Sequence, residues 1–324
     1  MQTIGIASFE EQAAAFDHSV TATPKISTFC SGSDWILSAH KNLHPPRETL
    51  VYEDDNHWLT LTQGPLFHLS NVIQPMESAW CFSCALIGPD PRHSVSLLLK
   101  LLRRRRENIS LLLLGGIPRG SKMHADCYRY IGKFFRIQAF PGSDCCEASL
   151  KGGADGYLSR RSVSFRASLR SGMRKAIKEG VDFEHLSGNM DGISILNRVL
   201  SVEMRSWKHG AGESVFRHHD HYQFYRDLIK RTASKGLFRA VFARREGEDI
   251  AYVIGGILGR KYRGFQMGFD ASMRAMGAGN LVQFELIEAL CDEGVEYYDL
   301  GMDMNYKRRW AENRLEFVNL LVTP

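Results

Sequence analysis

YRGFQMGFDASMRAMGAGNLVQFELIEAL, residues 262–290, contains in succession a predicted strand, a loop and a predicted helix. Tyr262–Phe269 predicts a strand, which a tight turn joins to the strand before it. Asp270–Ala278 is a loop, and Gly279–Glu293 predicts a helix because leucine, isoleucine and phenylalanine recur at helical spacing. A glycine-containing loop therefore lies between a strand and a helix.

This loop has the chemistry of an anion site. It ends in Arg274-Ala275-Met276-Gly277-Ala278-Gly279. Glycines let the backbone approach a phosphate closely and adopt positive φ. The start of the following helix offers unpaired N–H groups and a positive dipole end, and Arg274 adds a full charge. The simpler interpretation, a glycine-rich turn before an amphipathic helix, stays open on these residues alone.

The rest of the second half also gives clear signals. Leu158–Glu179 predicts an amphipathic helix with a basic stripe, and Gly180 ends it. Short connections between the three strands that precede the glycine loop make them antiparallel neighbours. The other predicted elements are the strand Val181–Leu186, the helices Asp191–Trp207 and His219–Ser234, the strands Leu237–Ala243, Ile250–Leu258 and Val295–Leu300, a short helix Tyr306–Glu312 and the strand Leu315–Val322.

The first half is harder to interpret. Val95–Arg106 predicts a helix with a basic end, and Ile109–Leu114 predicts a buried strand, a combination that suggests an α/β layer. Pro141–Gly156 holds four glycines in sixteen residues and few large apolar side chains, which is typical of a linker. We therefore expect two domains, residues 1–150 and 157–324.

Composition excludes several classes of protein. The 324 residues are 44% hydrophobic and 24% charged, ordinary values for a globular chain. No apolar stretch reaches the roughly 18 residues of a membrane span, and the first residues lack the regions of a secretory signal. With seven cysteines and no export signal, we expect reduced thiols and a cytoplasmic protein. A net charge of +5 does not imply a nucleic-acid partner, and we expect none.

Two patterns resemble metal sites but do not predict one. Cys81 and Cys84 form a lone C-x-x-C, whereas structural zinc needs four ligands. His218, His219 and His221 lie at a helix start, where successive side chains point around the axis and do not converge. We expect no metal.

The order of the predicted elements and the glycine loop together resemble those of a known family. The order β-α-α-β-β-β-α-β-α-β over Val181–Pro324 is similar to the GNAT acyltransferase fold, and Arg274–Gly279 resembles the R/Q-x-x-G-x-G/A pyrophosphate loop of that superfamily. The resemblance implies an α/β fold, with a mixed central sheet flanked by helices, and an acyl-CoA co-substrate, most simply acetyl-CoA. It also implies that the pantetheine arm lies between two splayed strands; a plain strand with a packing glycine is the alternative. The implied donor-binding residues are Met267, Gly268, Phe269, Arg274, Met276, Gly277, Ala278, Gly279 and Asn280.

A second motif points to one branch of the superfamily. Tyr298-Asp299-Leu300-Gly301 followed by Tyr306-Lys307 looks like the C-terminal signature of the CelD-type branch, which is related to the Fem-type aminoacyl transferases. That branch commonly shows a basic helix, here residues 159–180, and a later tryptophan, here Trp207. Its first half is usually a degenerate copy of the same fold. The resemblance thus implies two GNAT-like halves, with residues 1–150 the degenerate one.

The chemistry of acyl transfer to an amine needs a base and an acid. An amine with a pKa of about 10.4 must lose a proton, which a carboxylate can take, and Asp303 and Glu203 are the candidates. The departing thiolate benefits from a nearby acid, for which Tyr306 is the candidate. Each has a simpler interpretation: surface or ion-paired carboxylates, and a packed tyrosine. Asp299, on the strand itself, is interpreted as structural or as the partner of a helix cap.

The basic stripe has two interpretations. Arg166, Arg170, Arg174 and Lys178 form either a solvated helix face or an anion site for a phosphorylated acceptor, such as a nucleotide sugar, or for an acidic acyl carrier protein. The residues predicted to bind the acceptor are Arg166, Arg170, Trp207 and Lys307.

These observations predict an N-acyltransferase that moves an acyl group from a coenzyme A thioester to a small-molecule amine. An amino sugar, an amino acid or a natural-product amine would each fit. One alternative is a Fem-type transferase that uses aminoacyl-tRNA, which would not need the coenzyme A loop. The other is a non-catalytic binding protein that keeps the GNAT fold but not the thioester cleft.

Overall fold

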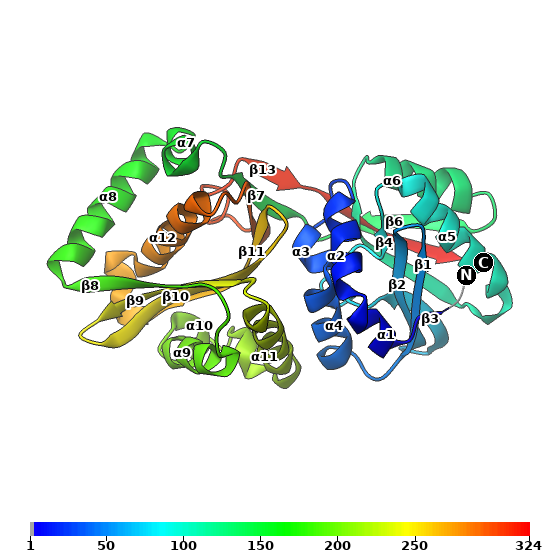
Figure 1. Ribbon diagram of the computed structural model, residues 1–324, viewed down its shortest axis with the longest axis horizontal. Coiled ribbons are helices and arrows are strands. Elements are labelled where there is room, and N and C mark those ends of the chain that lie inside the picture. The colour runs from blue at the N-terminus through cyan, green and yellow to red at the C-terminus, as the bar shows by residue number, and fades with distance from the viewer. Residues whose placement is uncertain (1–2) are drawn as a thin grey trace. The chain divides into compact units, whose positions relative to one another are not determined.

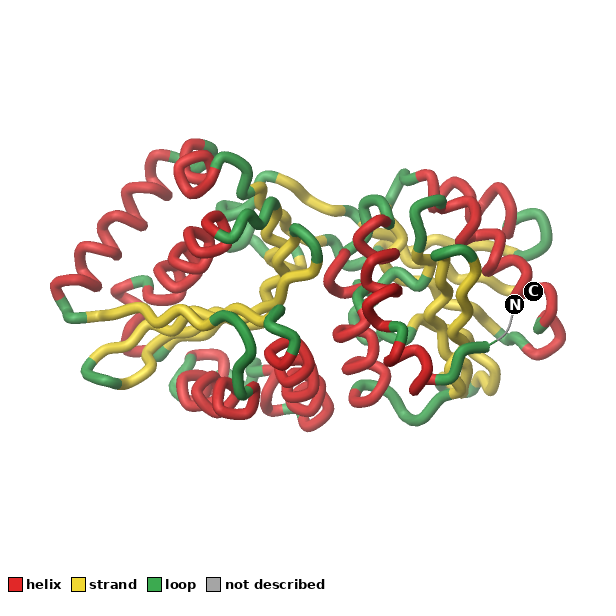
Figure 2. The backbone as a smooth tube through the Cα atoms, viewed as in Figure 1, coloured by secondary structure: helices red, strands yellow, loops and turns green. Residues whose placement is uncertain are grey.

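The computed structural model describes residues 3–324, which form two compact units (Figures 1 and 2). The C-terminal unit is Cys145–Arg314, and the N-terminal unit combines the preceding residues with Leu315–Pro324. We expected the last strand to complete the second domain. Instead β14 (Phe317–Thr323) pairs with β5 (Leu111–Pro118) and β6 (Arg136–Pro141), because its mostly buried side chains pack into the apolar sheet of the N-terminal unit.

The N-terminal unit contains a mixed sheet in the order β1-β2-β3-β5-β14-β6. The predicted helix and strand of this half are present as α5 and β5. The other strands are β1 (Glu48–Asp54), β2 (His57–Leu66), β3 (Leu69–Pro75) and β4 (Leu86–Ile87), and the helices are α1 (Ile6–Glu11), α2 (Ala13–Ala22), α3 (Thr28–Ser31), α4 (Ser33–Asn42), α5 (Pro91–Arg104) and α6 (Lys122–Asp126).

The loop that follows β3 is closed by an internal carboxylate. Glu77 is fully buried, and its oxygens accept hydrogen bonds from the backbone N–H groups of residues 80–83 at 2.7–3.3 Å. The next helix, α5, begins with Asp90 as its N-cap and Pro91 in its first turn. Glu77 therefore accepts the N–H groups of this loop, and Asp90 caps the start of α5. Between β3 and α5 the N-terminal unit thus leaves none of these N–H groups for a phosphate.

The C-terminal unit contains a mixed sheet in the order β13-β7-β12-β11-β10-β9-β8. Helices cover both faces, with α12, α7 and α8 on one and α9, α10 and α11 on the other (Figure 1). The strands are β7 (Cys145–Ser149), β8 (Val181–Leu186), β9 (Phe238–Arg245), β10 (Glu248–Leu258), β11 (Lys261–Phe269), β12 (Tyr297–Met302) and β13 (Asn313–Leu315). The helices are α7 (Gly153–Ser159), α8 (Val163–Lys178), α9 (Gly192–Met204), α10 (Trp207–Gly210), α11 (His219–Ser234) and α12 (Ala278–Asp292).

Strands β11 and β12 run parallel and then separate. They pair only through Lys261–Arg263 and Tyr297–Asp299. Just beyond this point the pairing of β11 with β10 shifts by one residue between Gly264 and Gln266, a β-bulge that bends the strand. We call the point of separation, after Arg263 and Asp299, the fork.

Three local predictions needed correction. The predicted linker contains β7, which is buried and pairs with β12, so its glycines lie only in the following turn. The helix predicted from Leu158 is divided, because the Ser162 side chain accepts the N–H of Phe165 and starts α8 afresh. The short helix predicted at Tyr306–Glu312 is a series of turns that leads into β13.

Candidate active site

The glycine loop forms an open cradle at the start of α12. A short 3-10 helix, Ala271–Met276, ends at Gly277, whose φ of +76° only glycine adopts at low cost. The first N–H groups of α12 then lack partners within the helix. A Cβ at Gly279 would lie 2.8 Å from Cδ1 of Phe269, so glycine lets the helix start approach β11 closely.

Two cations border this cradle. Arg274 is exposed and forms no ion pair within residues 3–324. Arg309, which the sequence analysis missed, donates from Nη2 to Asn280 Oδ1 at 2.8 Å. Its only sequence signal is its place two residues after Lys307. The arrangement of helix N-terminus and two arginines suits a phosphate-bearing ligand.

The fork holds a buried ion pair. Arg263 and Asp299 are 4% and 5% exposed, and Arg263 Nη1 lies 2.8 Å from both carboxylate oxygens. Asp299 Oδ1 also accepts the N–H of Gly301 at 2.8 Å. Asp299 is therefore structural, as the sequence suggested. Arg263 was missed, because its role depends on the parallel register of two strands far apart in the sequence.

Lys307 extends beside this ion pair. A Cβ built on Gly301 would lie 3.5 Å from Lys307 Nζ and 3.2 Å from Arg263 Nη2, so both cations crowd one point at the fork. Lys307 Nζ forms no hydrogen bond or ion pair with the residues that the structure describes. Burial and the neighbouring Arg263 charge lower the pKa of Lys307 to about 8.

Glu203 reaches β11 from α9. Its side chain is 2% exposed, and Oε2 accepts a hydrogen bond from the Tyr252 hydroxyl at 2.8 Å. Oε1 has no hydrogen-bond partner. A Cβ at Gly268 would lie 2.6 Å from Oε2, so the glycine makes room for the carboxylate. The structure thus brings Glu203 to the strand that was predicted to line the donor.

Asp303 lies in a different environment. Arg308 donates to both of its oxygens at 2.8 Å, Arg314 lies 3.2 Å away, and the Cys146 thiol donates to Oδ1 at 3.3 Å. The hydrogen bond from Arg308 is the main cause of a pKa lowered to about 2. So acidic a group is a poor acceptor of protons at neutral pH, and the geometry argues against Asp303 as the base.

Tyr306 and Trp207 are both largely exposed, at 46% and 41%. Burial of the hydroxyl raises the pKa of Tyr306 above its ordinary value. A thiol has a pKa of about 8.5, so Lys307 matches a departing thiolate better than Tyr306 does.

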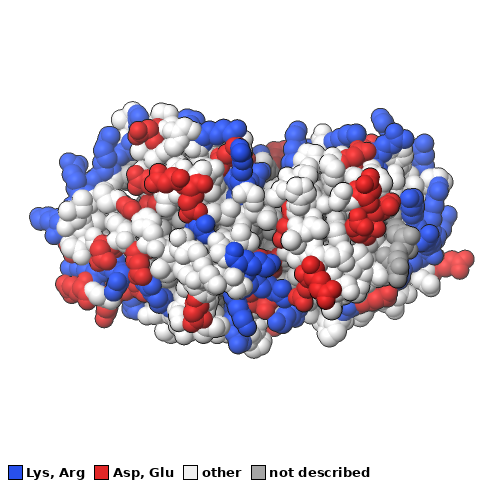
Figure 3. All heavy atoms as spheres, viewed as in Figure 1, with Lys and Arg blue, Asp and Glu red and all other residues white. Residues whose placement is uncertain are grey.

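The basic helix lies beside the donor cradle. A Cβ at Gly172 of α8 would lie 3.2 Å from both Met276 O and Leu281 Cδ2. Arg170 is exposed, and Arg166 is half-buried with an unpartnered Nε. In Figure 3 blue side chains follow the edge along which Figure 1 draws α8, so the stripe is open to an anionic ligand.

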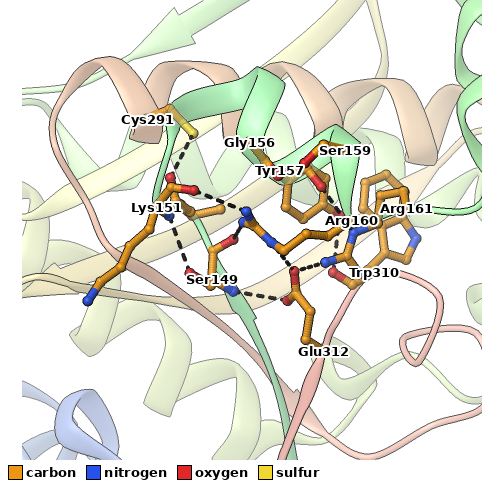
Figure 4. Close-up of polar contacts among 11 residues, drawn as sticks. Ser149, Lys151, Gly156, Tyr157, Ser159, Arg160, Arg161, Cys291, Trp310 and Glu312 are labelled. Atoms are coloured by element: carbon orange, nitrogen blue, oxygen red, sulfur yellow. Dashed lines mark hydrogen bonds and ion pairs between the residues drawn. The ribbon is translucent and has the colours of Figure 1, made fainter.

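A polar network fixes the start of α8 (Figure 4). Arg160 donates to Glu312 Oε1 at 2.8 Å and to Ser149 O at 2.6 Å, and Arg161 pairs with the same carboxylate. The Tyr157 hydroxyl donates to Trp310 O at 3.1 Å. These contacts tie the basic helix to β7 and to the turn that carries Lys307 and Arg309.

Two features are absent from residues 3–324. No helix there is long and apolar enough to cross a bilayer. No three histidine, cysteine or acidic side chains there gather as metal ligands would.

Comparisons with known proteins agree with the geometry. A family model described as the acetyltransferase (GNAT) domain matches residues 163–308, from the start of α8 to the turn beyond β12. The predicted family resemblance is thereby confirmed for this segment. No curated protein matches the chain.

Solved structures share the fold over the whole chain. FemX is 10% identical with a TM-score of 0.70, covering 98% of this chain and 97% of FemX. A conserved protein of unknown function from Bacteroides thetaiotaomicron VPI-5482 is 12% identical with a TM-score of 0.67. The match covers 100% of this chain and 99% of that chain. The C-terminal domain (DUF2156) of a putative lysylphosphatidylglycerol synthetase from Agrobacterium fabrum is 14% identical with a TM-score of 0.58. The match covers 95% of this chain and 93% of that chain. The predicted α/β fold with two GNAT-like halves is confirmed.

Proposed function

We propose that this chain, whose residues 163–308 belong to the acetyltransferase (GNAT) domain family, is an N-acyltransferase that uses a coenzyme A thioester. The observation that carries the proposal is the cradle at the start of α12, which continues along β11 to the fork. Within Met276–Asn280 the phosphates would bind the N–H groups of Ala278 and Gly279, together with Arg274 and Arg309, since the N–H groups of Gly277 and Asn280 already donate to Arg274 O and Gly277 O. The acyl thioester would then reach the fork beside Lys307.

The reaction forms one bond and breaks another. The neutral amine nitrogen attacks the thioester carbon, and the tetrahedral intermediate expels the thiolate as the C–S bond breaks. Lys307, whose pKa is about 8, is mostly protonated at pH 7 and can give its proton to the thiolate. The Arg263–Asp299 pair holds the fork in which Lys307 lies.

Glu203 is the proposed base. Its Oε1 lacks a hydrogen-bond partner, whereas the oxygens of Asp303 are held by two arginines. Oε2 lies beside Gly268 and is held by Tyr252, which leaves Oε1 to take the proton of an incoming amine, directly or through a water. Its burial restricts this role to an acceptor that reaches the end of β11.

We propose that the acceptor is a small-molecule amine, and that the exposed side chain of Trp207 lies near the acceptor site. The arginines of α8 support a phosphorylated acceptor, such as a nucleotide sugar, or contact with the donor phosphates, since α8 packs against the donor loop. An acyl carrier protein as donor would use the same fork through its pantetheine arm.

One observation favours a second candidate, an aminoacyl-tRNA-dependent transferase of the Fem type. Lys208 Nζ donates to Met267 O at 2.7 Å, on the strand predicted to line the pantetheine arm. A donor without such an arm would not need that carbonyl. The cradle and its two arginines serve either donor, because both carry phosphates.

Substitution of Gly279 and Arg274 tests the cradle. With acetyl-CoA at about 100 times its Kd, we expect the free energy of unfolding of the wild-type chain to rise by about 2.7 kcal/mol. Gly279→Val should abolish this stabilisation, because its Cβ would lie 2.8 Å from Phe269 Cδ1 and close the helix start. Arg274→Met should weaken binding about ten-fold through loss of a charge-assisted contact. Thermal shift and circular dichroism measure both.

Lys230→Met is the matched control, since it removes an exposed cation from α11 and should leave binding unchanged. If the wild-type chain gains no stability from millimolar acetyl-CoA or free coenzyme A, the donor assignment is wrong. If Arg274→Met binds as tightly as Lys230→Met, the phosphates lie elsewhere.

A further inference from the structure

The edge of β11 that faces away from β10 would have to bind the donor's arm. The N–H of Asp270 donates to Ile250 O at 2.8 Å, on the β10 side. Because peptide groups alternate in direction along a strand, those of Met267 and Phe269 face the opposite side. Among the described residues, 3–324, no strand pairs with this side of β11 beyond Arg263, so its carbonyls need other partners.

The chain itself supplies partners along that edge. Ser206 forms an isolated antiparallel bridge with Asp270, and the N–H of Ala271 donates to Arg205 O at 3.0 Å. These backbone contacts hold residues 205–208 beside the end of β11. Lys208, at the end of this segment, reaches back along the edge, where its Nζ donates to Met267 O at 2.7 Å.

The Lys208 ammonium is poorly satisfied where it lies. Its side chain is 23% exposed, and the nearest carboxylate oxygen, Glu203 Oε1, is 3.9 Å away, beyond hydrogen-bond distance. Burial lowers the pKa of Lys208. A cation with one carbonyl hydrogen bond and one long ion pair to Glu203 in a partly dry site is costly to keep there, so a neutral donor can compete for the carbonyl.

On the basis of the proposed function, we propose that Lys208 is a donor-selecting residue, because its ammonium occupies the Met267 carbonyl oxygen. A donor with an amide in its arm, as in the pantetheine of coenzyme A, replaces the ammonium by an amide N–H on Met267 O. The displaced Nζ can turn toward solvent, because the Lys208 side chain is already 23% exposed, and Glu203 Oε1 then stays available as the proposed base. A donor without an arm amide leaves Lys208 in place.

Binding titrations of the complete chain test this proposal. The variants are Lys208→Met, which keeps the length of the side chain without its charge, and the control Lys230→Met. The probes are acetyl-CoA and adenosine 3′,5′-bisphosphate, which has the phosphates of coenzyme A without its arm. We expect Lys208→Met to bind acetyl-CoA about ten-fold more tightly than the wild type, because no ammonium must be displaced. The bisphosphate should bind both forms equally, and Lys230→Met should match the wild type.

Three results would count against the proposal or its premise. An unchanged or weaker affinity of Lys208→Met for acetyl-CoA overturns it. Equal tightening of both probes overturns it too, since the effect would then not involve the arm. If no form, wild type included, binds acetyl-CoA, the proposed function itself fails. Should Lys208→Met not fold because Glu203 loses its neighbouring charge, the double variant with Glu203→Gln takes its place in the same titrations.

Discussion

Lys307→Met is expected to lower kcat by roughly 10²–10³-fold while leaving the affinity for acetyl-CoA nearly unchanged, because a side-chain acid typically contributes 10²–10⁴-fold. The substitution keeps the length and apolar body of the side chain. It removes a group at the fork whose pKa, about 8, lies near that of a departing thiol. Steady-state kinetics with a thiol-detecting reagent would measure the loss.

The pH profile separates acid catalysis from a packing role. Lys307 donates its proton only while protonated, so kcat of the wild type should fall as the pH rises through about 8. Lys307→Met should lose this descending limb. Tyr306→Phe, a change at the neighbouring and largely exposed residue, is the matched control and should cost less than ten-fold. A Tyr306→Phe variant that loses activity while Lys307→Met keeps it would return the role of acid to the tyrosine.

Asp299→Ala is expected to lower the free energy of unfolding by about 3–5 kcal/mol, because it leaves the Arg263 guanidinium buried without its carboxylate. The N–H of Gly301 loses its acceptor in the same variant. Chemical denaturation monitored by circular dichroism would give the change.

Two further variants show whether burial is the cause. Glu296→Ala removes a half-buried carboxylate that pairs with the exposed cations Arg260 and Lys151 at the start of the same two strands, and should cost less than about 1 kcal/mol per pair. The double variant Arg263→Met with Asp299→Leu should recover most of the stability, since it removes both charges together. Equal losses for Glu296→Ala and Asp299→Ala would contradict this account of the fork.

The parts of the fold that follow from local sequence were predicted well. Strands β9 to β11 are joined by short turns, and the glycine loop with α12 has a strand on one side and apolar helical spacing on the other. Such features depend on residues close together in the chain. The glycine loop, Gly277 and Gly279 included, was therefore placed between its strand and helix without the structure, whereas its role as a donor cradle stays a proposal.

Features that depend on distant partners were missed. β7 lies in a glycine-rich segment and becomes a strand only because β12 pairs with it. β14 was predicted within the second domain, but its partners are β5 and β6. Likewise the pKa of Lys307 depends on Arg263 of β11. No local pattern in the sequence shows how β11 and β12 are in register.

Hydrogen–deuterium exchange of the full chain with and without saturating acetyl-CoA shows directly whether the donor binds at the start of α12. We predict slower exchange in the peptide that covers residues 271–281, where the N–H groups at the start of α12 would bind the phosphates, and less slowing in Gly279→Val. Slower exchange confined to other segments, or none at millimolar acetyl-CoA, would contradict the assignment of this chain as an acyl-CoA-dependent transferase.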